Sequence, residues 1–279
     1  MPQSERRDPD FYRAIEVWAL RALDEGPACA ADLIARLAAA SADNLRYRAD
    51  GLVHVSPRQM NLVLGRLRRR GVIKSGGDPN LWVSSARGHR ELARLKRSAD
   101  TIDKDAAADL LVSMLDPTPA PQTALDVGTG GGFMACKLAE AGFDVLGVDR
   151  WVAEGAVGSL TAAEQAACER ELRIEFRWAD VKSLRRRDYF DCAVASNSVH
   201  EMPDPRGAFG AVLRVLKPGG VFACLDFAVG AASFVNTGFH SLLALTPTEW
   251  RRELHAAGFP RVRIHDLGAR LIVLARKPE

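Results

Sequence analysis

The stretch ALDVGTGGGFMA, residues 124–135, decides the fold of this chain. Residues 124–127 form the short apolar run of a buried strand, and four glycines follow within five positions: Gly128, Gly130, Gly131 and Gly132. Because glycine has no Cβ, the backbone there can turn sharply and approach a ligand closely. Residues 133–141 then predict a helix. The stretch therefore predicts a strand, a turn and a helix that place a nucleotide-like ligand at the end of a parallel sheet.

Two cofactors compete for such a turn. The pattern Gly130-x-Gly132-x-x-Ala135 fits the dinucleotide fingerprint, in which a helix N-terminus binds a pyrophosphate. The pattern Asp126-x-Gly128-x-Gly130-x-Gly132 instead resembles motif I of the class I S-adenosylmethionine-dependent methyltransferases. In that family the acid lies inside the motif, and the ligand carries a zwitterionic methionine end in place of a pyrophosphate. An acid at position 126 would repel a pyrophosphate.

Acids also end the next two predicted strands. The strand over residues 143–149 ends in Asp149, which follows Asp126 by 23 residues. A carboxylate there can accept hydrogen bonds from both ribose hydroxyls, and this suits either cofactor. A third strand, residues 173–178, is followed by Asp180. Its position resembles the place where the methyltransferases carry a carboxylate that accepts from the adenine amino group.

The later motifs favour the methyltransferase family. A fourth strand spans residues 190–196, and a helix over 205–216 stops at the proline and glycines of 217–220. A fifth strand is expected over 221–227. The string VLRVLKPGGVF, residues 212–222, closely resembles the same segment of class I methyltransferases, and dinucleotide dehydrogenases do not carry it.

The resemblance covers about residues 102–279 and closes with two strands, residues 261–266 and 270–275. It implies an α/β fold with a Rossmann-like, doubly wound sheet of seven strands, in which the closing hairpin supplies an antiparallel strand. It also implies S-adenosylmethionine as the cofactor and a small-molecule methyl acceptor. The sequence does not choose between oxygen, nitrogen and carbon as the methylated atom. The NPPY pattern of nucleic-acid amino methylases is absent at residues 196–199.

The same resemblance implies a set of cofactor-binding residues: Asp126, Gly128, Gly130, Gly132, Asp149, Asp180, Val181 and Asn197. The glycines would bring backbone against the methionine and ribose, and Asp126 would orient the amino end through the turn. Asp149 would hold the ribose, Asp180 with Val181 would bracket the adenine, and Asn197 would line the floor of the methionine site.

Histidine has the intrinsic pKa of a general base, and His200 with Glu201 follows the fourth strand at the ligand-facing edge. We therefore predict His200 and Glu201 as catalytic residues, with His240 as the second choice of base. The alternative is that His200 and Glu201 only cap the next loop. The scattered cysteines and histidines show no metal-ligand spacing, so no metal is assigned.

The first hundred residues predict a separate, basic domain. They hold 18 Lys and Arg against 12 Asp and Glu, whereas residues 101–279 hold 20 against 23. Helices are expected over residues 10–23, 30–37 and 57–70, followed by two short strands and a helix over 86–98. This order, and the string SPRQMNLVLGRLRRRGVI at 56–73, resembles the winged helix of PadR-type regulators. We predict a smaller α+β winged-helix domain over 1–100 and a methyltransferase domain over 101–279.

Three functions remain open. In the favoured one, the winged helix serves dimerisation or covers the substrate, as the resemblance to small-molecule O-methyltransferases implies, and the enzyme is a homodimer. In the second, the chain is a transcriptional regulator that senses a ligand and binds DNA with Arg58, Gln59 and Asn61 near the bases. In the third, the fold binds the cofactor but catalyses another reaction or none.

The composition and the lengths of the apolar runs indicate where in the cell the protein is expected to act. Hydrophobic residues make up 47% of the chain, as in an ordinary globular protein. No apolar run approaches the roughly 18 residues of a membrane helix, and the first ten residues lack the apolar core of a signal peptide. We therefore expect a cytoplasmic protein without a membrane partner.

Overall fold

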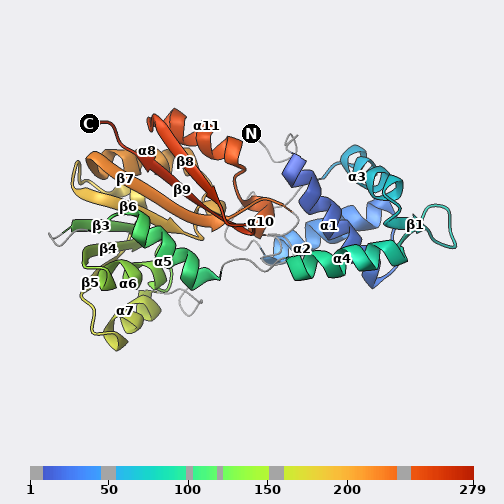
Figure 1. Cartoon of the computed structure of the whole chain (residues 1–279), viewed down its shortest axis with the longest axis horizontal. Coiled ribbons are helices and arrows are strands. Elements are labelled where there is room, and N and C mark those ends of the chain that lie inside the picture. The colour runs from blue at the N-terminus through green and yellow to red at the C-terminus, as the bar shows by residue number, and fades with distance from the viewer. Residues whose placement is uncertain (1–8, 45–54, 99–102, 118–121, 151–159, 231–239) are drawn as a thin grey trace. The chain divides into compact units, whose positions relative to one another are not determined.

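The computed structural model of the chain describes residues 9–44, 55–98, 103–117, 122–150, 160–230 and 240–279. The chain divides into two compact units (Figure 1). The N-terminal unit comprises Met1–Thr101 with Phe227–Thr246, and the sheet unit comprises Ile102–Asp226 with Pro247–Glu279. The sequence predicted a single boundary after residue 100. Residues 227–246 were expected in the second domain, whereas the described residues Val229, Leu243 and Ala244 lie in the core of the N-terminal unit.

The sheet unit is built on seven strands: β3 (Gln122–Val127), β4 (Phe143–Asp149), β5 (Ile174–Trp178), β6 (Phe190–Ser196), β7 (Leu216–Phe227), β8 (Arg261–Asp266) and β9 (Arg270–Arg276). Their order is β5-β4-β3-β6-β7-β9-β8. Strands β5, β4, β3, β6 and β7 pair in parallel, and β8 pairs antiparallel with β9. This mostly parallel arrangement confirms the predicted sheet of seven strands. The strand order reverses between β3 and β6, and ligands of such sheets bind at the carboxyl ends beside that point.

Two layers of helices cover the sheet (Figure 1). Helices α5 (Lys104–Met114), α6 (Phe133–Glu140) and α7 (Leu160–Glu169) lie on one face, and α8 (Pro205–Val215) and α11 (Pro247–Ala257) lie on the other. The side chains of alternate residues of β7 face the two layers of helices. Ala223 and Leu225 are buried with α5 and α6. Phe222 packs against Phe209 of α8, with ring centroids 5.6 Å apart.

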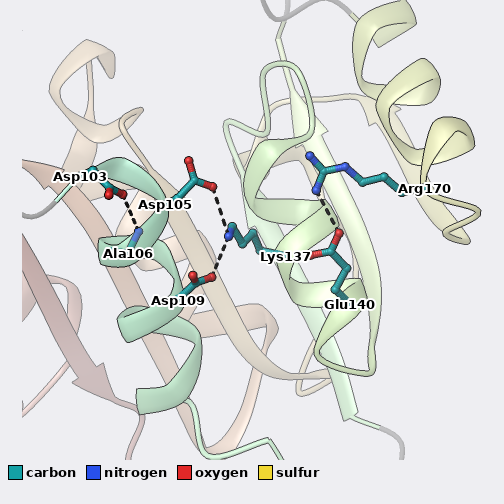
Figure 2. A network of polar contacts seen from close by, with 7 residues as sticks. All are labelled: Asp103, Asp105, Ala106, Asp109, Lys137, Glu140 and Arg170. Carbon is teal, nitrogen blue, oxygen red and sulfur yellow. Dashed lines mark hydrogen bonds and ion pairs between the residues drawn. The ribbon is translucent and has the colours of Figure 1, made fainter.

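A polar network joins the helices that precede and follow the glycine turn (Figure 2). Asp103 caps α5, because its side chain accepts from the N–H of Ala106 at 2.8 Å. Lys137 of α6 reaches back to α5 and lies 2.7 Å from Asp109 and 3.2 Å from Asp105. These contacts fix α6, which begins directly after the turn.

Strand β7 begins earlier than the sequence predicted. We expected it from residue 221, whereas it starts at Leu216, directly after α8 ends at Val215. The reason is pairing with β6, because Leu216 lies opposite Phe190. The end of the chain pairs with the same part of β7. The N–H of Gly219 donates to the carbonyl of Pro278, and the N–H of Lys277 donates to that of Gly220. Gly219 adopts a φ of 73°, which glycine adopts without strain.

The N-terminal unit contains α1 (Pro9–Glu25), α2 (Ala30–Asn44), α3 (Pro57–Arg69), β1 (Ile73–Ser75), β2 (Trp82–Ser84), α4 (Ala86–Ser98) and α10 (His240–Leu243). Ser56 caps α3 in a reciprocal capping box with Gln59. Strands β1 and β2 form an antiparallel hairpin, and Ala28 bridges to Trp82 beside it. Leu243 and Ala244 join the same core. Helices long and apolar enough to cross a membrane are absent from the described ranges.

Candidate functional site

The glycine turn holds the carboxyl end of β3 against β4. The N–H groups of Gly128 and Thr129 donate to the carbonyl of Val148, at 2.8 and 3.2 Å. Gly128, Gly130 and Gly132 have φ values of 72°, 52° and 80°. At Gly128 a Cβ atom would lie 2.5 Å from the Cβ of Ser198. The backbone conformation and the close approach therefore both require glycine at position 128.

Asp126 is fully buried beneath this turn. Its Oδ2 accepts from the hydroxyl of Thr129 at 2.7 Å, and its Oδ1 accepts no hydrogen bond from any residue that the structure describes. Burial raises the pKa of Asp126 to about 7, although the hydrogen bond from Thr129 opposes the shift. A buried carboxyl with one unsatisfied oxygen marks the turn as a place prepared for a polar or cationic ligand.

Asp149 and Asp180 lie at the carboxyl ends of neighbouring strands. Asp149 ends β4, and its Oδ2 accepts from the N–H of Gly130 at 2.8 Å. The N–H of Ala179 donates to the carbonyl of Asp149 at 2.9 Å, which aligns the end of β5 with that of β4. Asp180 then caps a short 3-10 helix that begins at the buried Val181. The three predicted nucleoside contacts thus follow adjacent strands at one edge.

Asn197 follows β6 at the same edge, in a left-handed conformation with a φ of 50°. Its N–H donates to the carbonyl of Leu225 in β7 at 2.8 Å. Its side-chain oxygen Oδ1 accepts from Nη1 of Arg270 at 2.7 Å. The next residue, Ser198, donates its hydroxyl to the carbonyl of Val127 at 2.9 Å, so the β6 exit is tied to the glycine turn.

His200 is buried, with only 2% of its surface exposed. Its Nδ1 lies 2.7 Å from Oδ1 of Asp226, and its backbone N–H donates to Oδ2 of the same carboxylate at 3.0 Å. Its Nε2 lies 3.6 Å from Oε1 of Glu201. Burial alone would lower the pKa of His200, but the charge and hydrogen bond of Asp226 outweigh it and raise the pKa to about 9. The imidazole is therefore protonated at pH 7.

The structure brings four residues to this edge that sequence reasoning did not name: Lys104, Thr129, Asp226 and Arg270. Lys104 lies at the start of α5, with its Nζ 3.8 Å from the ring centroid of Phe133. Burial and the nearby Arg270 lower the pKa of Lys104, while Asp105 and Asp126 oppose the shift. Only Thr129 lay within a motif that the sequence singled out. The other three come from segments that the sheet order alone brings together.

The side chain of His240, the second predicted base, lies outside the described residues. Across the described ranges, no three His, Cys, Asp or Glu side chains gather as ligands for a metal ion.

Residues 125–224 match the family profile of the "Methyltransferase domain". This part of the chain is a methyltransferase domain. The chain is also 31% identical over 144 residues to the ubiquinone biosynthesis O-methyltransferase of Alkalilimnicola ehrlichii, covering 49% of this chain and 56% of that protein. The corresponding enzyme of Acinetobacter baumannii is 30% identical over 152 residues, covering 53% and 62%. The chain thus spans less than two thirds of the length of these curated relatives.

Solved structures share the fold of the methyltransferase domain. The [4+2]-cyclase SpnF is 24% identical, with a TM-score of 0.50 over 63% of this chain and 82% of its own. The phosphoethanolamine N-methyltransferase 2 of Haemonchus contortus, in complex with S-adenosyl-L-methionine, has a TM-score of 0.52 at 13% identity over 70% and 58%. The CurJ carbon methyltransferase has a TM-score of 0.52 at 12% identity over 97% and 91%.

Proposed function

We propose that this chain is an S-adenosylmethionine-dependent methyltransferase that transfers a methyl group to an oxygen atom of a small-molecule acceptor. The curated relatives support the choice of oxygen, because their names describe O-methyltransferases. We further propose that it acts as a cytoplasmic homodimer. The reaction is an in-line displacement, in which positioning of the two reactants supplies much of the catalysis.

One observation carries this proposal: Asp149 ends β4 and Asp180 follows the neighbouring parallel strand β5, beside a left-handed glycine turn. The arrangement fits S-adenosylmethionine. The ribose hydroxyls would be held by Asp149, and the adenine would lie between Asp180 and Val181. Asp126, with one unsatisfied oxygen, lies under the part of the turn that would receive the cationic amino end. The cofactor, when bound, supplies a methyl group on a positively charged sulfur.

The residues of the chain would hold the donor while an acceptor oxygen approaches. Gly128, Gly130 and Gly132 leave room for the ligand against the backbone, and Asn197 forms the floor beside them. His200 and Glu201 remain the candidate acid–base residues. Since His200 is protonated at pH 7, it serves as a base only after it loses its proton, near pH 9. At lower pH it holds Asp226 and Glu201 in place as their positive partner.

We propose that the N-terminal unit is a winged helix that serves dimerisation or covers the substrate. The contacts of α3 support this role over DNA binding. Arg70 lies 2.7 Å from the buried Glu16, and Arg66 lies 3.6 Å from it. Arg68 lies over the ring of Trp82 at 5.7 Å from the centroid. The side chain of Gln59, one of the predicted base contacts, accepts from the N–H of Ser56 instead. These groups stabilise the unit itself.

Three measurements test the proposed function. The protein is purified from cells and any retained ligand is identified by mass spectrometry, and its mass in solution is measured by gel filtration with light scattering. We expect S-adenosylhomocysteine or its precursor in a dimer. Methyl transfer is then assayed with labelled cofactor against a panel of phenols, catechols, amines and carbon acids. Cofactor binding without transfer to any acceptor would favour another reaction, as in the cyclase that shares this fold.

A further inference from the structure

We propose that Arg270 is a positioning residue for the cofactor, because it sets the direction of the Asn197 side-chain amide. The inference rests on the proposed function and assigns a role to a residue outside the glycine turn and the acids. Arg270 is the first residue of β9. The residues after β9 pair with the start of β7, because the N–H of Lys277 donates to the carbonyl of Gly220. Strand β9 therefore runs antiparallel to β7, and its amino end lies at the edge where the parallel strands end. A cation from the last hairpin thus arrives at the ligand edge.

In the hydrogen bond between the two side chains, only Arg270 can be the donor and only Asn197 the acceptor. A guanidinium donates and cannot accept, so the atom of Asn197 that faces Nη1 at 2.7 Å is the carbonyl oxygen. The amide NH2 group must then point elsewhere. No residue in the described ranges is hydrogen-bonded to that nitrogen. Arg270 therefore presents Asn197 as a donor of N–H groups.

The backbone of Asn197 holds this arrangement in place. Its φ of 50° is uncommon for a residue other than glycine and is maintained by the bond from its N–H to Leu225. Burial lowers the pKa of Arg270, and the negative charge of Asp226 opposes the shift. The guanidinium itself donates to the Asn197 oxygen at 2.7 Å. Both ends of the Asn197 residue are thus anchored.

The ligand group that fits an N–H donor here is the carboxylate of the methionine end. Asn197 is followed by Ser198, whose Cβ lies against Gly128, and the glycine turn is where the methionine part would lie. A carboxylate accepts amide N–H groups and would be repelled by a carboxylate at position 197. The adenosine end of the cofactor would lie instead by Asp149 and Asp180, on the β4 and β5 side of the turn.

The test compares two ligands by calorimetry. S-adenosylhomocysteine carries the amino-acid end, and 5′-methylthioadenosine lacks it. We expect R270M and N197D to lower the affinity for S-adenosylhomocysteine about tenfold or more. The affinity for 5′-methylthioadenosine should change less than about twofold. N197D keeps a partner for Arg270, loses the N–H groups and adds a negative charge that repels the ligand carboxylate. R270Q can still donate to Asn197 and should recover part of the affinity. R276M, at the far end of the same strand, serves as the control.

Equal weakening of both ligands by R270M would overturn the proposal and show a general structural role. Unchanged binding of S-adenosylhomocysteine to R270M or to N197D would also overturn it. Failure of the proposed function gives a different result, because the unmodified protein would then bind neither ligand. Circular dichroism of each variant establishes that the fold is retained.

Discussion

The Nδ1 atom of His200 lies 2.7 Å from Oδ1 of Asp226, and each side chain is only 1% exposed. The pair joins the exit of β6 to the end of β7, two strands whose carboxyl ends form one wall of the candidate site. Each group is the main compensation for the buried charge of the other, since an isolated charge in such a place is costly.

We therefore predict that H200Q destabilises the protein by about 3 kcal/mol at pH 7, because the buried Asp226 loses the charge of its partner at 2.7 Å. The pKa of His200 is raised above that of an unfolded histidine, so its stabilising effect is complete below about pH 6.5 and is lost as the pH rises through about 9. Urea unfolding of the unmodified protein and of H200Q, at pH 6 and at pH 10, measures the difference in stability at each pH. H89Q is the control, because His89 pairs with Asp24 at 2.6 Å on the surface. Equal losses in the two variants would contradict the account.

The pH dependence of turnover tests His200 as the base. If His200 takes the acceptor proton, kcat/KM should rise about tenfold per pH unit until it levels off near pH 9, where the imidazole becomes neutral. The variant E201Q should keep this rise if Glu201 only neighbours the base. A profile that is flat between pH 6 and 9, with H200A retaining turnover, would remove His200 from the chemistry and leave it a structural role.

The glycine turn gives a prediction about packing. G128A should lose stability and S-adenosylhomocysteine affinity together, because its Cβ would meet Ser198 at 2.5 Å in a left-handed conformation that costs about 1–2 kcal/mol for other residues. G210A is the matched control, since Gly210 lies in α8 with no atom within 4 Å of the added Cβ. We expect G210A to be neutral or to stabilise by up to about 1 kcal/mol. Thermal unfolding and calorimetry of both variants decide the point.

The arginines of α3 should matter for stability rather than for DNA. R70M should destabilise the protein by about 1–3 kcal/mol, because the buried Glu16 loses its 2.7 Å partner. R58A, which alters an exposed residue of the same helix, should have little effect on unfolding. A salt-dependent, sequence-selective mobility shift that R58A or R68A weakens would instead favour the regulator hypothesis.

The sequence predicted those parts of the site that depend on single strands. Asp126, Asp149 and Asn197 could be placed because each lies at the end of, or directly after, an apolar run whose end is visible in the residue pattern. The glycines could be placed because so many of them directly after a buried strand are typical of a ligand-binding turn. Strand β7 begins earlier than predicted, since the pairing of Leu216 with Phe190 is a long-range contact that no local pattern contains.

The residues that contact the predicted site residues could not be predicted from local sequence patterns. Asp226 meets His200 only because β7 lies beside β6, and Arg270 meets Asn197 only because an antiparallel β9 lies beside β7. The burial that raises the pKa of Asp126, and the buried Asp226 that raises the pKa of His200, likewise arise from the packed layers on the sheet. Strand order and packing therefore determine the electrostatics of residues whose identity the sequence already indicates.

Calorimetric titration of S-adenosylhomocysteine into the purified protein, with D149A and D144A beside it, tests the central claim most directly. Asp149 lies at the carboxyl end of β4 and Asp144 near its amino end. We predict that the unmodified protein and D144A bind with equal affinity, and that D149A binds at least about tenfold more weakly while remaining folded. Binding of a nicotinamide dinucleotide with none of S-adenosylmethionine or S-adenosylhomocysteine, or equal binding by D149A, would contradict the account.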